Sequence, residues 1–184
     1  MLKGKLVNLR ALEMTDLDRE YAWVNDREVT RFLIIRYPMS RADEERWLRD
    51  GPANTFANVR LAIDAKDGAH IGNIGLHEQR TEDRVAALGI MIGEREYWSK
   101  GYGTDAVVTL LRFAFHEMNL NRVWLSVFEI NERAMACYRK CGFREEGRLR
   151  QDRFIEGRYY DTVLMGVLRD EFEALHGAPA VMSQ

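Results

Sequence analysis

The stretch of sequence that decides the fold is Tyr97-Trp98-Ser99-Lys100-Gly101-Tyr102-Gly103-Thr104. It follows Val85–Ile92, a run that is apolar on both faces and is therefore typical of a central β-strand. It precedes apolar residues at helical spacing, which predict an amphipathic helix: Val107, Leu110, Leu111, Ala114, Phe115 and Met118. The sequence thus predicts a strand, a loop with two glycines and the start of a helix.

This order of elements favours an anion-binding loop. Backbone N–H groups at the start of a helix lack partners and lie at the positive end of the helix dipole. Gly101 and Gly103 let that backbone approach a bulky anion without a Cβ in the way. The stretch is too short for a Walker A loop and lacks the third glycine of a dinucleotide fingerprint. Because a single Gly-x-Gly is more often an ordinary turn, the surrounding sequence has to decide.

A second unit follows the predicted helix. Residues 123–128 predict another apolar strand, Asn131 is suited to cap a helix, and Gly142 is suited to end it. The two units together resemble the GNAT superfamily of N-acetyltransferases. In that family an Arg/Gln-x-x-Gly-x-Gly/Ala loop is followed by Asn-x-x-Ala/Ser and then by Tyr, Lys and Gly-Phe, which match Asn131, Ala134, Tyr138, Lys140, Gly142 and Phe143 here.

The resemblance covers roughly residues 85–143, and the order of the remaining predicted elements is also similar. The later stretch Phe154-Ile155-Glu156-Gly157-Arg158-Tyr159-Tyr160-Asp161 is similar to the branch that contains ribosomal-protein N-terminal acetyltransferases and spermidine acetyltransferases. Trp98 departs from the family pattern, since many relatives carry Arg or Gln there.

The resemblance implies a set of site residues. The coenzyme A pyrophosphate would be held by Ser99, Lys100, Gly101, Tyr102, Gly103 and Thr104. The pantetheine arm would lie along the backbone of Met91 and Ile92 and would contact Asn131. Tyr138 would donate a proton to the departing thiolate, although periodicity alone, with Ala134, Cys137 and Cys141 on the same stripe, predicts a core tyrosine.

The sequence contains more than one candidate for the general base. Ala87 occupies the place where many members of this branch carry a glutamate on the central strand. An amine must be neutral to attack a thioester, and lysine-type amines titrate near about 10.4, so some group must remove a proton. We predict Glu78 as this catalytic carboxylate, with Glu82 and Asp83 as alternatives and with a solvated surface position as the ordinary interpretation of each.

The fold class predicted from these elements is α+β of GNAT type: a mixed β-sheet with helices on both faces and a cofactor cleft between two splayed central strands. A strand is expected around residues 6–9, and helices after Thr15, with Asp18 completing its capping box, and after Ser40. Turns are expected at 66–68 and 156–157, and a short helix at 170–176. We expect one acetyltransferase domain at 1–176 and a flexible tail at 177–184.

Composition excludes several other classes. Lys plus Arg number 27 and Asp plus Glu 29, so no summed field attracts nucleic acid. The apolar runs are shorter than the roughly 20 residues of a membrane span, which favours a cytoplasmic protein with no membrane partner. The cysteines, Cys137 and Cys141, are interpreted as reduced core thiols. The four histidines show no ligand spacing, so no metal is expected.

The function implied is transfer of an acetyl group from acetyl-CoA, as co-substrate, to a primary amine by direct attack. The acceptor is open between a protein N-terminal amine, a polyamine and another small-molecule amine. Two acidic groups, at 43–45 and 82–83, are candidates for attracting a polycation, although solvated surface is the more ordinary interpretation. An alternative of another class is a non-catalytic acyl-CoA-binding module. The resemblance allows a homodimer, and a monomer stays equally open.

Overall fold

The computed structural model describes residues 1–178, which form one eight-stranded sheet with the order β1-β2-β3-β4-β5-β6-β8-β7. The strands are β1 (Leu2–Lys3), β2 (Val7–Ala11), β3 (Val59–Ala65), β4 (His70–Arg80), β5 (Val85–Ile92), β6 (Arg122–Phe128), β7 (Arg144–Ile155) and β8 (Arg158–Leu168). Neighbouring strands are antiparallel except for β5 and β6, which are parallel. The predicted mixed sheet is confirmed.

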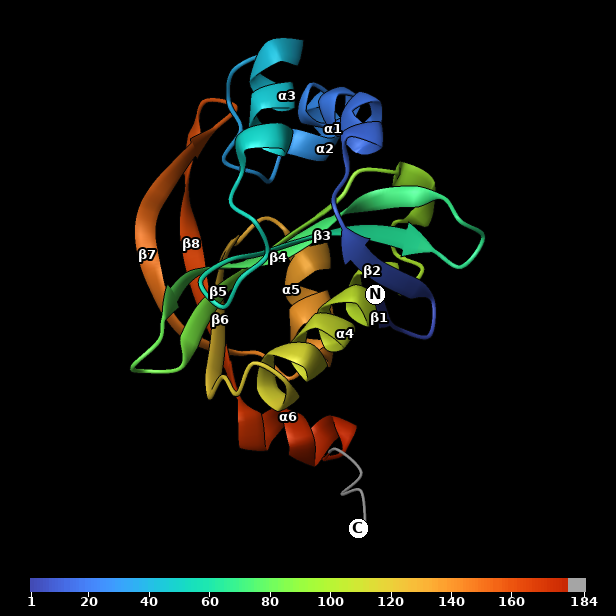
Figure 1. Cartoon of the computed structure of the whole chain (residues 1–184). Coiled ribbons are helices and arrows are strands. Elements are labelled where there is room, and N and C mark those ends of the chain that lie inside the picture. Colours follow the sequence, from blue (N-terminus) through green and yellow to red (C-terminus); the bar gives the residue numbers. More distant parts are fainter. Residues whose placement is uncertain (179–184) are drawn as a thin grey trace.

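The helices gather in separate groups around this sheet (Figure 1). They are α1 (Leu17–Val24), α2 (Arg27–Thr30), α3 (Arg41–Asp50), α4 (Tyr102–His116), α5 (Glu132–Lys140) and α6 (Arg169–His176). Helices α1, α2 and α3 lie together at one end of the molecule, α4 and α5 lie side by side near its middle, and α6 lies at the opposite end. Two short 3₁₀ turns, Met14–Asp16 and Arg95–Tyr97, precede α1 and α4.

The main core lies between the sheet and helix α4. The predicted stripe of α4 is buried, with Val107, Leu110 and Leu111 fully inaccessible to solvent. These side chains belong to one apolar cluster with Ile74 of β4 and Leu125 of β6. Since full burial of one aliphatic side chain contributes about 1.5–3 kcal/mol, this packing holds α4 against the sheet.

Most of the local signals read from the sequence are confirmed. The Ser40 hydroxyl accepts a hydrogen bond from Asp43 N–H (3.1 Å), and the Asn131 side chain accepts one from Ala134 N–H (3.2 Å). Gly142 follows the end of α5 with φ of 103°, a left-handed conformation that glycine adopts without strain. Residues 156–157 both have positive φ, as a two-residue hairpin turn requires.

The predicted capping box at Thr15 and Asp18 is wrong. Helix α1 begins at Leu17, and Asp16 precedes it. The Asp16 carboxylate instead accepts a hydrogen bond from Glu13 N–H (2.9 Å) and pairs with Arg10 (2.8 Å). A buried carboxylate with an arginine partner is held more firmly than an exposed cap, and this pairing sets the helix start. The tail expected at 177–184 lies outside the described residues from position 179 onward.

Candidate active site

The parallel strands β5 and β6 diverge soon after they begin. Their register contains only Val85 with Arg122, Ala86 with Val123 and Ala87 with Trp124. Beyond these pairs β5 remains joined to β4, and β6 remains joined to β8. The facing backbone edges of the two strands are therefore unpaired after Ala87 and Trp124, and an extended chain can pair with such an edge as an added strand. The predicted splay of the central strands is confirmed.

The predicted role of Met91 and Ile92 depends on this edge. The Met91 side chain is buried beside Trp23 and Val29, which makes it part of a small cluster beneath α1 and α2. The Ile92 carbonyl accepts a hydrogen bond from the Trp98 indole N–H (2.8 Å). Because that carbonyl already has a partner, it is less available to a pantetheine arm than the backbone of the preceding residues.

The loop before α4 has the geometry of an anion cradle. Ser99 and Gly101 have positive φ values of 59° and 92°. Gly101 stands at the start of α4 and has no side chain to cap it, and the first helical bond runs from Asp105 N–H to the Gly101 carbonyl (2.9 Å). The N–H groups of residues 102–104 therefore precede the helical bonding pattern and can bind phosphate oxygens.

Gly103 places this helix start above the end of β5 and beside α5. A Cβ at Gly103 would lie 3.8 Å from the Ile92 side chain and 3.9 Å from the Cys137 sulfur. Thr104 supports the same contact, because its hydroxyl lies 3.3 Å from the Cys137 sulfur. The residues predicted to hold the pyrophosphate are thus brought against the helix that carries Asn131 and Tyr138.

Asp105 anchors the cradle in a way that the sequence analysis missed. Its carboxylate accepts hydrogen bonds from the backbone N–H groups of Lys5 (3.1 Å), Leu6 (2.7 Å) and Val7 (3.0 Å). Gly4 permits this close approach, because a Cβ there would lie 2.4 Å from the carboxylate. The negative charge of Asp105 is thereby bound by the backbone of the N-terminal segment. An aspartate in a first helical turn was the only available signal, and it does not identify a partner.

Arg133 is a second site residue that the sequence analysis missed. Its guanidinium lies over the Trp98 ring, 3.8 Å from the ring centroid. Within residues 1–178 it forms no ion pair with a carboxylate, so its charge is available beside the loop. Trp98 occupies the Arg/Gln position of the motif described above, and Arg133 of α5 brings a guanidinium to its ring. An aromatic platform of this kind orients a guanidinium for phosphate binding.

Tyr138 occupies a buried position next to the cradle. It is 9% exposed, and its ring contacts Phe143 edge to face, with 5.8 Å between the ring centroids. Burial, together with the neighbouring Cys137 and Cys141 thiols, raises the pKa of the Tyr138 phenol. The phenol is therefore protonated at neutral pH, which is the state that a proton donor requires.

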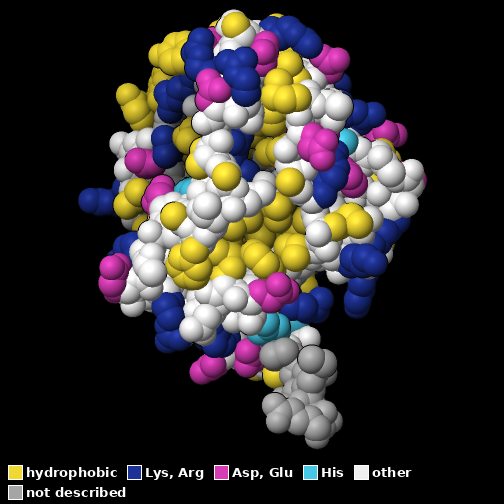
Figure 2. Space-filling model, viewed as in Figure 1, with side chains coloured by type: hydrophobic (Ala, Val, Ile, Leu, Met, Phe, Trp, Pro, Cys, Tyr) yellow, Lys and Arg dark blue, Asp and Glu magenta, His cyan; other side chains and the backbone are white. Residues whose placement is uncertain are grey.

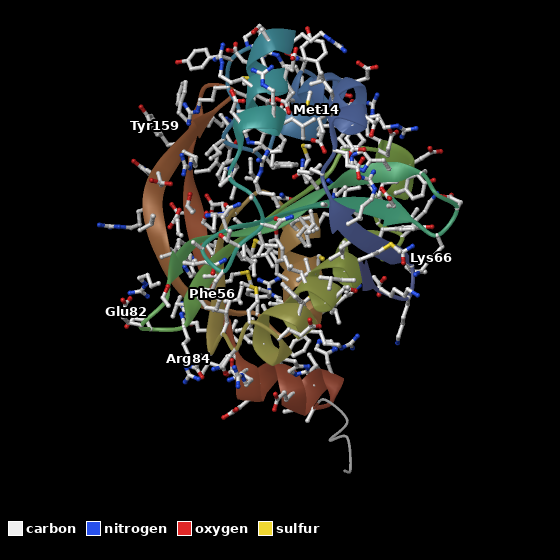
Figure 3. All side chains as sticks on the ribbon, in the orientation of Figure 1. Met14, Phe56, Lys66, Glu82, Arg84 and Tyr159 are labelled. Carbon is white, nitrogen blue, oxygen red and sulfur yellow. The ribbon has the colours of Figure 1, made fainter. Side chains whose placement is uncertain are left out.

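The three carboxylates considered as bases differ in position. Glu78 lines a shallow pocket of about 450 Å³ with Gln79, Arg80, Arg122 and Trp124. Glu82 lies at the tip of the turn between β4 and β5 (Figure 3), and Asp83 in the same turn pairs with Arg80 (3.0 Å). Ala87 of β5 is buried, soon after the turn that carries Glu82 and Asp83 ends. Of the three, Glu78 is the one beside the point where β5 and β6 part.

Two buried carboxylates, Glu20 and Glu44, lie on helices α1 and α3. Glu20 of α1 accepts a hydrogen bond from the Asn73 amide (2.7 Å), and its side chain is inaccessible to solvent. Glu44 of α3 is 3% exposed, so one member of the acidic group at 43–45 turns inward. Burial, followed by the charge of Glu20, raises the pKa of Glu44 to about 7, against the opposing effect of Arg60.

Charge is mixed over the surface. Figure 2 shows basic and acidic side chains interspersed on one face, with hydrophobic side chains gathered near its middle. None of the helices within residues 1–178 is long and apolar enough to span a membrane. The same residues contain no group of three or more His, Cys, Asp and Glu side chains arranged to hold a metal ion.

Comparison with known proteins agrees with this site. Residues 7–144 match the acetyltransferase (GNAT) domain family. The chain is 31% identical over 173 residues to spermidine N(1)-acetyltransferase of Escherichia coli (strain K12), covering 94% of this chain and 91% of that protein. It is 31% identical over 178 residues to the putative ribosomal N-acetyltransferase YdaF of Bacillus subtilis (strain 168), covering 91% and 93%.

The fold is also similar to that of a solved enzyme. The crystal structure of spermidine N-acetyltransferase from Vibrio cholerae, in complex with CoA and spermine, superposes with a TM-score of 0.80 at 29% identity. The match covers 92% of this chain and 99% of that one. Sequence and structure agree, and this chain belongs to the GNAT family of acetyltransferases as an N-acetyltransferase.

Proposed function

We propose that this N-acetyltransferase binds acetyl-CoA between β5 and β6 and transfers the acetyl group to a primary aliphatic amine, without an acyl-enzyme. The observation that carries the proposal is the divergence of β5 and β6 after Ala87 and Trp124. The unpaired edge of β5 ends at Ile92, which lies against Gly103 at the uncapped start of α4. An unpaired strand edge and a free helix N-terminus are what an extended pantetheine arm and a pyrophosphate require.

The residues present fit coenzyme A. The backbone N–H groups of residues 99–104 would bind the pyrophosphate, and Arg133 would add a cation from α5. Asn131 caps α5 through its side-chain oxygen, which leaves its amide N–H₂ free to contact the arm. The bound thioester supplies the activated acetyl group, and the chain's own residues orient it and move the protons.

The chemistry needs a proton to leave the amine and another to reach the sulfur. The amine nitrogen forms a bond to the thioester carbonyl carbon, and the C–S bond breaks as the tetrahedral intermediate collapses. Tyr138 donates its phenolic proton to the departing sulfur, and such a positioned donor contributes typically about 10²–10⁴-fold. Glu78 takes part in removing the proton from the amine, since it lies closest to the divergence among the predicted carboxylates.

A polyamine is the first candidate for the acceptor. The relatives named spermidine N-acetyltransferases support it. A protein N-terminal amine is the second candidate, and the similarity to the putative ribosomal N-acetyltransferase YdaF supports it. The two classes differ in size and in the basicity of the amine, so a substrate panel separates them.

Pairing of two copies is a further part of the proposal. Phe154 and Tyr159 are 49% and 63% exposed near the tip of the β7–β8 hairpin, and their rings contact each other. Exposed aromatic side chains of this kind are typical of protein interfaces. Light scattering of the purified protein tests the homodimer, and a monomer at micromolar concentration contradicts it.

The function is tested by calorimetric titration with acetyl-CoA, followed by an acetylation assay. The assay panel contains spermidine, spermine, a lysine derivative and peptides with free N-termini. We expect micromolar binding, about −8 kcal/mol, and turnover on at least one amine. Binding without turnover on any amine supports the non-catalytic module, and absence of binding contradicts the proposal.

A further inference from the structure

His77 lies directly opposite Ala87 across strands β4 and β5. Residues opposite each other in an antiparallel pair project to the same face of the sheet, with Cβ atoms about 4.5–5.5 Å apart. Ala87 is also the last β5 residue in register with β6. His77 therefore stands at the point where the two central strands part. It lies beside Ala87, the position at which the resemblance leads one to expect a glutamate.

The His77 ring leans along β5 toward the open part of the strand. Gly89 is the next residue of β5 on the same face, and a Cβ built there would lie 3.5 Å from His77 Nε2 and 3.8 Å from Cδ2. Because Gly89 has no side chain, its backbone is open to His77 Nε2. The imidazole thus faces the first residues beyond the last pairing of β5 with β6.

The second ring nitrogen faces a carboxylate. His77 Nδ1 lies 3.6 Å from Glu78 Oε1, and the two side chains are 50% and 64% exposed. Glu78 is the one described residue that forms an ion pair with this ring, while Arg80 and Arg122 line the neighbouring pocket with Glu78. A carboxylate beside one imidazole nitrogen stabilises the positive charge that forms when the other nitrogen takes a proton.

The two faces of β5 separate this imidazole from Tyr138. Leu76 and Leu88 are opposite each other and belong to the core cluster that includes α4 and Tyr138. Because side chains alternate along a strand, His77 and Ala87 project to the other face. An amine arriving from the His77 face would meet the thioester on the side away from the phenol, which leaves the sulfur accessible to Tyr138.

We propose that His77 is the general base of this enzyme and that Glu78 is its positioning residue. The inference rests on the proposed function. His77 Nε2 first takes a proton from the substrate ammonium group, and the neutral amine nitrogen then bonds to the carbonyl carbon. The C–S bond breaks as Tyr138 protonates the sulfur, and the second proton of the nitrogen returns to the Tyr138 phenolate. Imidazoles exchange protons near neutral pH, which suits this step. Glu78 then acts through His77, which accounts for a carboxylate so near the divergence.

The experiment compares His77→Gln with Glu78→Gln and uses His176→Gln, on the distant helix α6, as a matched control. Rates are measured with the best amine of the acetylation panel at pH 7, and acetyl-CoA binding is measured by calorimetry. We expect His77→Gln to lower kcat about 100-fold, Glu78→Gln to lower it less than tenfold, and the control to keep the parent rate. Acetyl-CoA binding should stay within threefold in all variants.

The pH dependence distinguishes a base from a structural role. A base is needed only while the amine is protonated, so the defect of His77→Gln should shrink as the pH approaches the amine's own pKa. It should also be smaller for a peptide α-amine, near about 7.7–8.0, than for an alkyl amine near about 10.4. Imidazole added to His77→Ala should restore part of the rate, which a folding defect would not allow.

Three outcomes overturn the assignment. A His77→Gln enzyme that keeps its rate within threefold, while Glu78→Gln loses about 100-fold, assigns the base to Glu78 instead. A defect that is equal at every pH and for both amine classes, without rescue by imidazole, shows a structural role. A parent protein that binds acetyl-CoA but acetylates no amine refutes the proposed function, and the base assignment fails with it.

Discussion

The carboxylate of Asp105, in the first turn of α4, accepts a hydrogen bond of 2.7 Å from the backbone N–H of Leu6, almost a hundred residues earlier in the chain. The same carboxylate accepts bonds from the two neighbouring N–H groups, so one side chain joins the N-terminal segment to the loop that would hold the pyrophosphate. The position of the cradle therefore depends on a contact outside the coenzyme site itself.

Replacing Asp105 by alanine should lower both stability and cofactor affinity. The substitution leaves three backbone N–H groups without their acceptor, at a cost of about 2–3 kcal/mol. Chemical denaturation should show this loss, and calorimetry should show weaker acetyl-CoA binding. Asp170→Asn, on exposed α6, is the control and should change neither value. A stable Asp105→Ala protein with parent affinity would show that the N-terminal segment does not support the cradle.

Arg133 should contribute to coenzyme binding through its charge. We expect Arg133→Gln to weaken acetyl-CoA binding about tenfold and to reduce the salt dependence of that binding, because a phosphate contact is screened by salt. Arg139→Gln, an exposed arginine on the same helix, is the matched control. Titrations at two ionic strengths measure both effects, and an unchanged salt dependence would mean that Arg133 only covers Trp98.

Tyr138→Phe should reduce turnover at least tenfold and should change acetyl-CoA binding little. The substitution keeps the ring that contacts Phe143 and removes only the proton donor. Steady-state rates and a parallel calorimetric titration provide the two values. Turnover equal to that of the parent protein would leave Tyr138 as a core residue.

Glu44 should make stability depend on pH. Its folded-state pKa is raised from 4.5 to about 7, so the folded protein binds an extra proton in that interval and loses stability as the pH rises through it. Glu44→Gln should therefore stabilise the protein by about 1–2 kcal/mol at pH 8 and have little effect at pH 4. Thermal unfolding at both pH values checks this. Glu45→Gln, whose exposed carboxylate pairs with Arg49, should show no such pH dependence.

Cys137 should be the more reactive of the two thiols. Its hydrogen bond with Cys141, and then that with Thr104, lowers the pKa of Cys137, while the same interaction and burial raise the pKa of Cys141. Iodoacetamide should therefore modify Cys137 first, as peptide mass spectrometry would show. Bound acetyl-CoA should slow the reaction, because Cys137 touches the start of α4. Equal rates with and without acetyl-CoA would place the coenzyme elsewhere.

Features that depend on neighbouring residues could be predicted from the sequence. Ser40 and Asn131 cap helices as expected, because a cap is a bond to a backbone group only a few residues away. The α4 stripe and the turn at 156–157 are also local patterns. The motifs of residues 97–104 and 131–143 were sufficient to indicate the family, since their spacing reflects one strand-loop-helix unit after another.

Only the tertiary structure decided which distant side chains meet. The error at Thr15 shows the reason on a small scale, since Asp16 pairs with Arg10, and Arg10 is also held by Asp64 of β3, far along the chain. Asp105 at Leu6, Arg133 over Trp98 and His77 opposite Ala87 depend on strand register and helix packing. Local conformation depends on neighbouring residues, so the sequence alone determines it. Which distant side chains meet depends on the packing of the whole core, to which every element contributes at once.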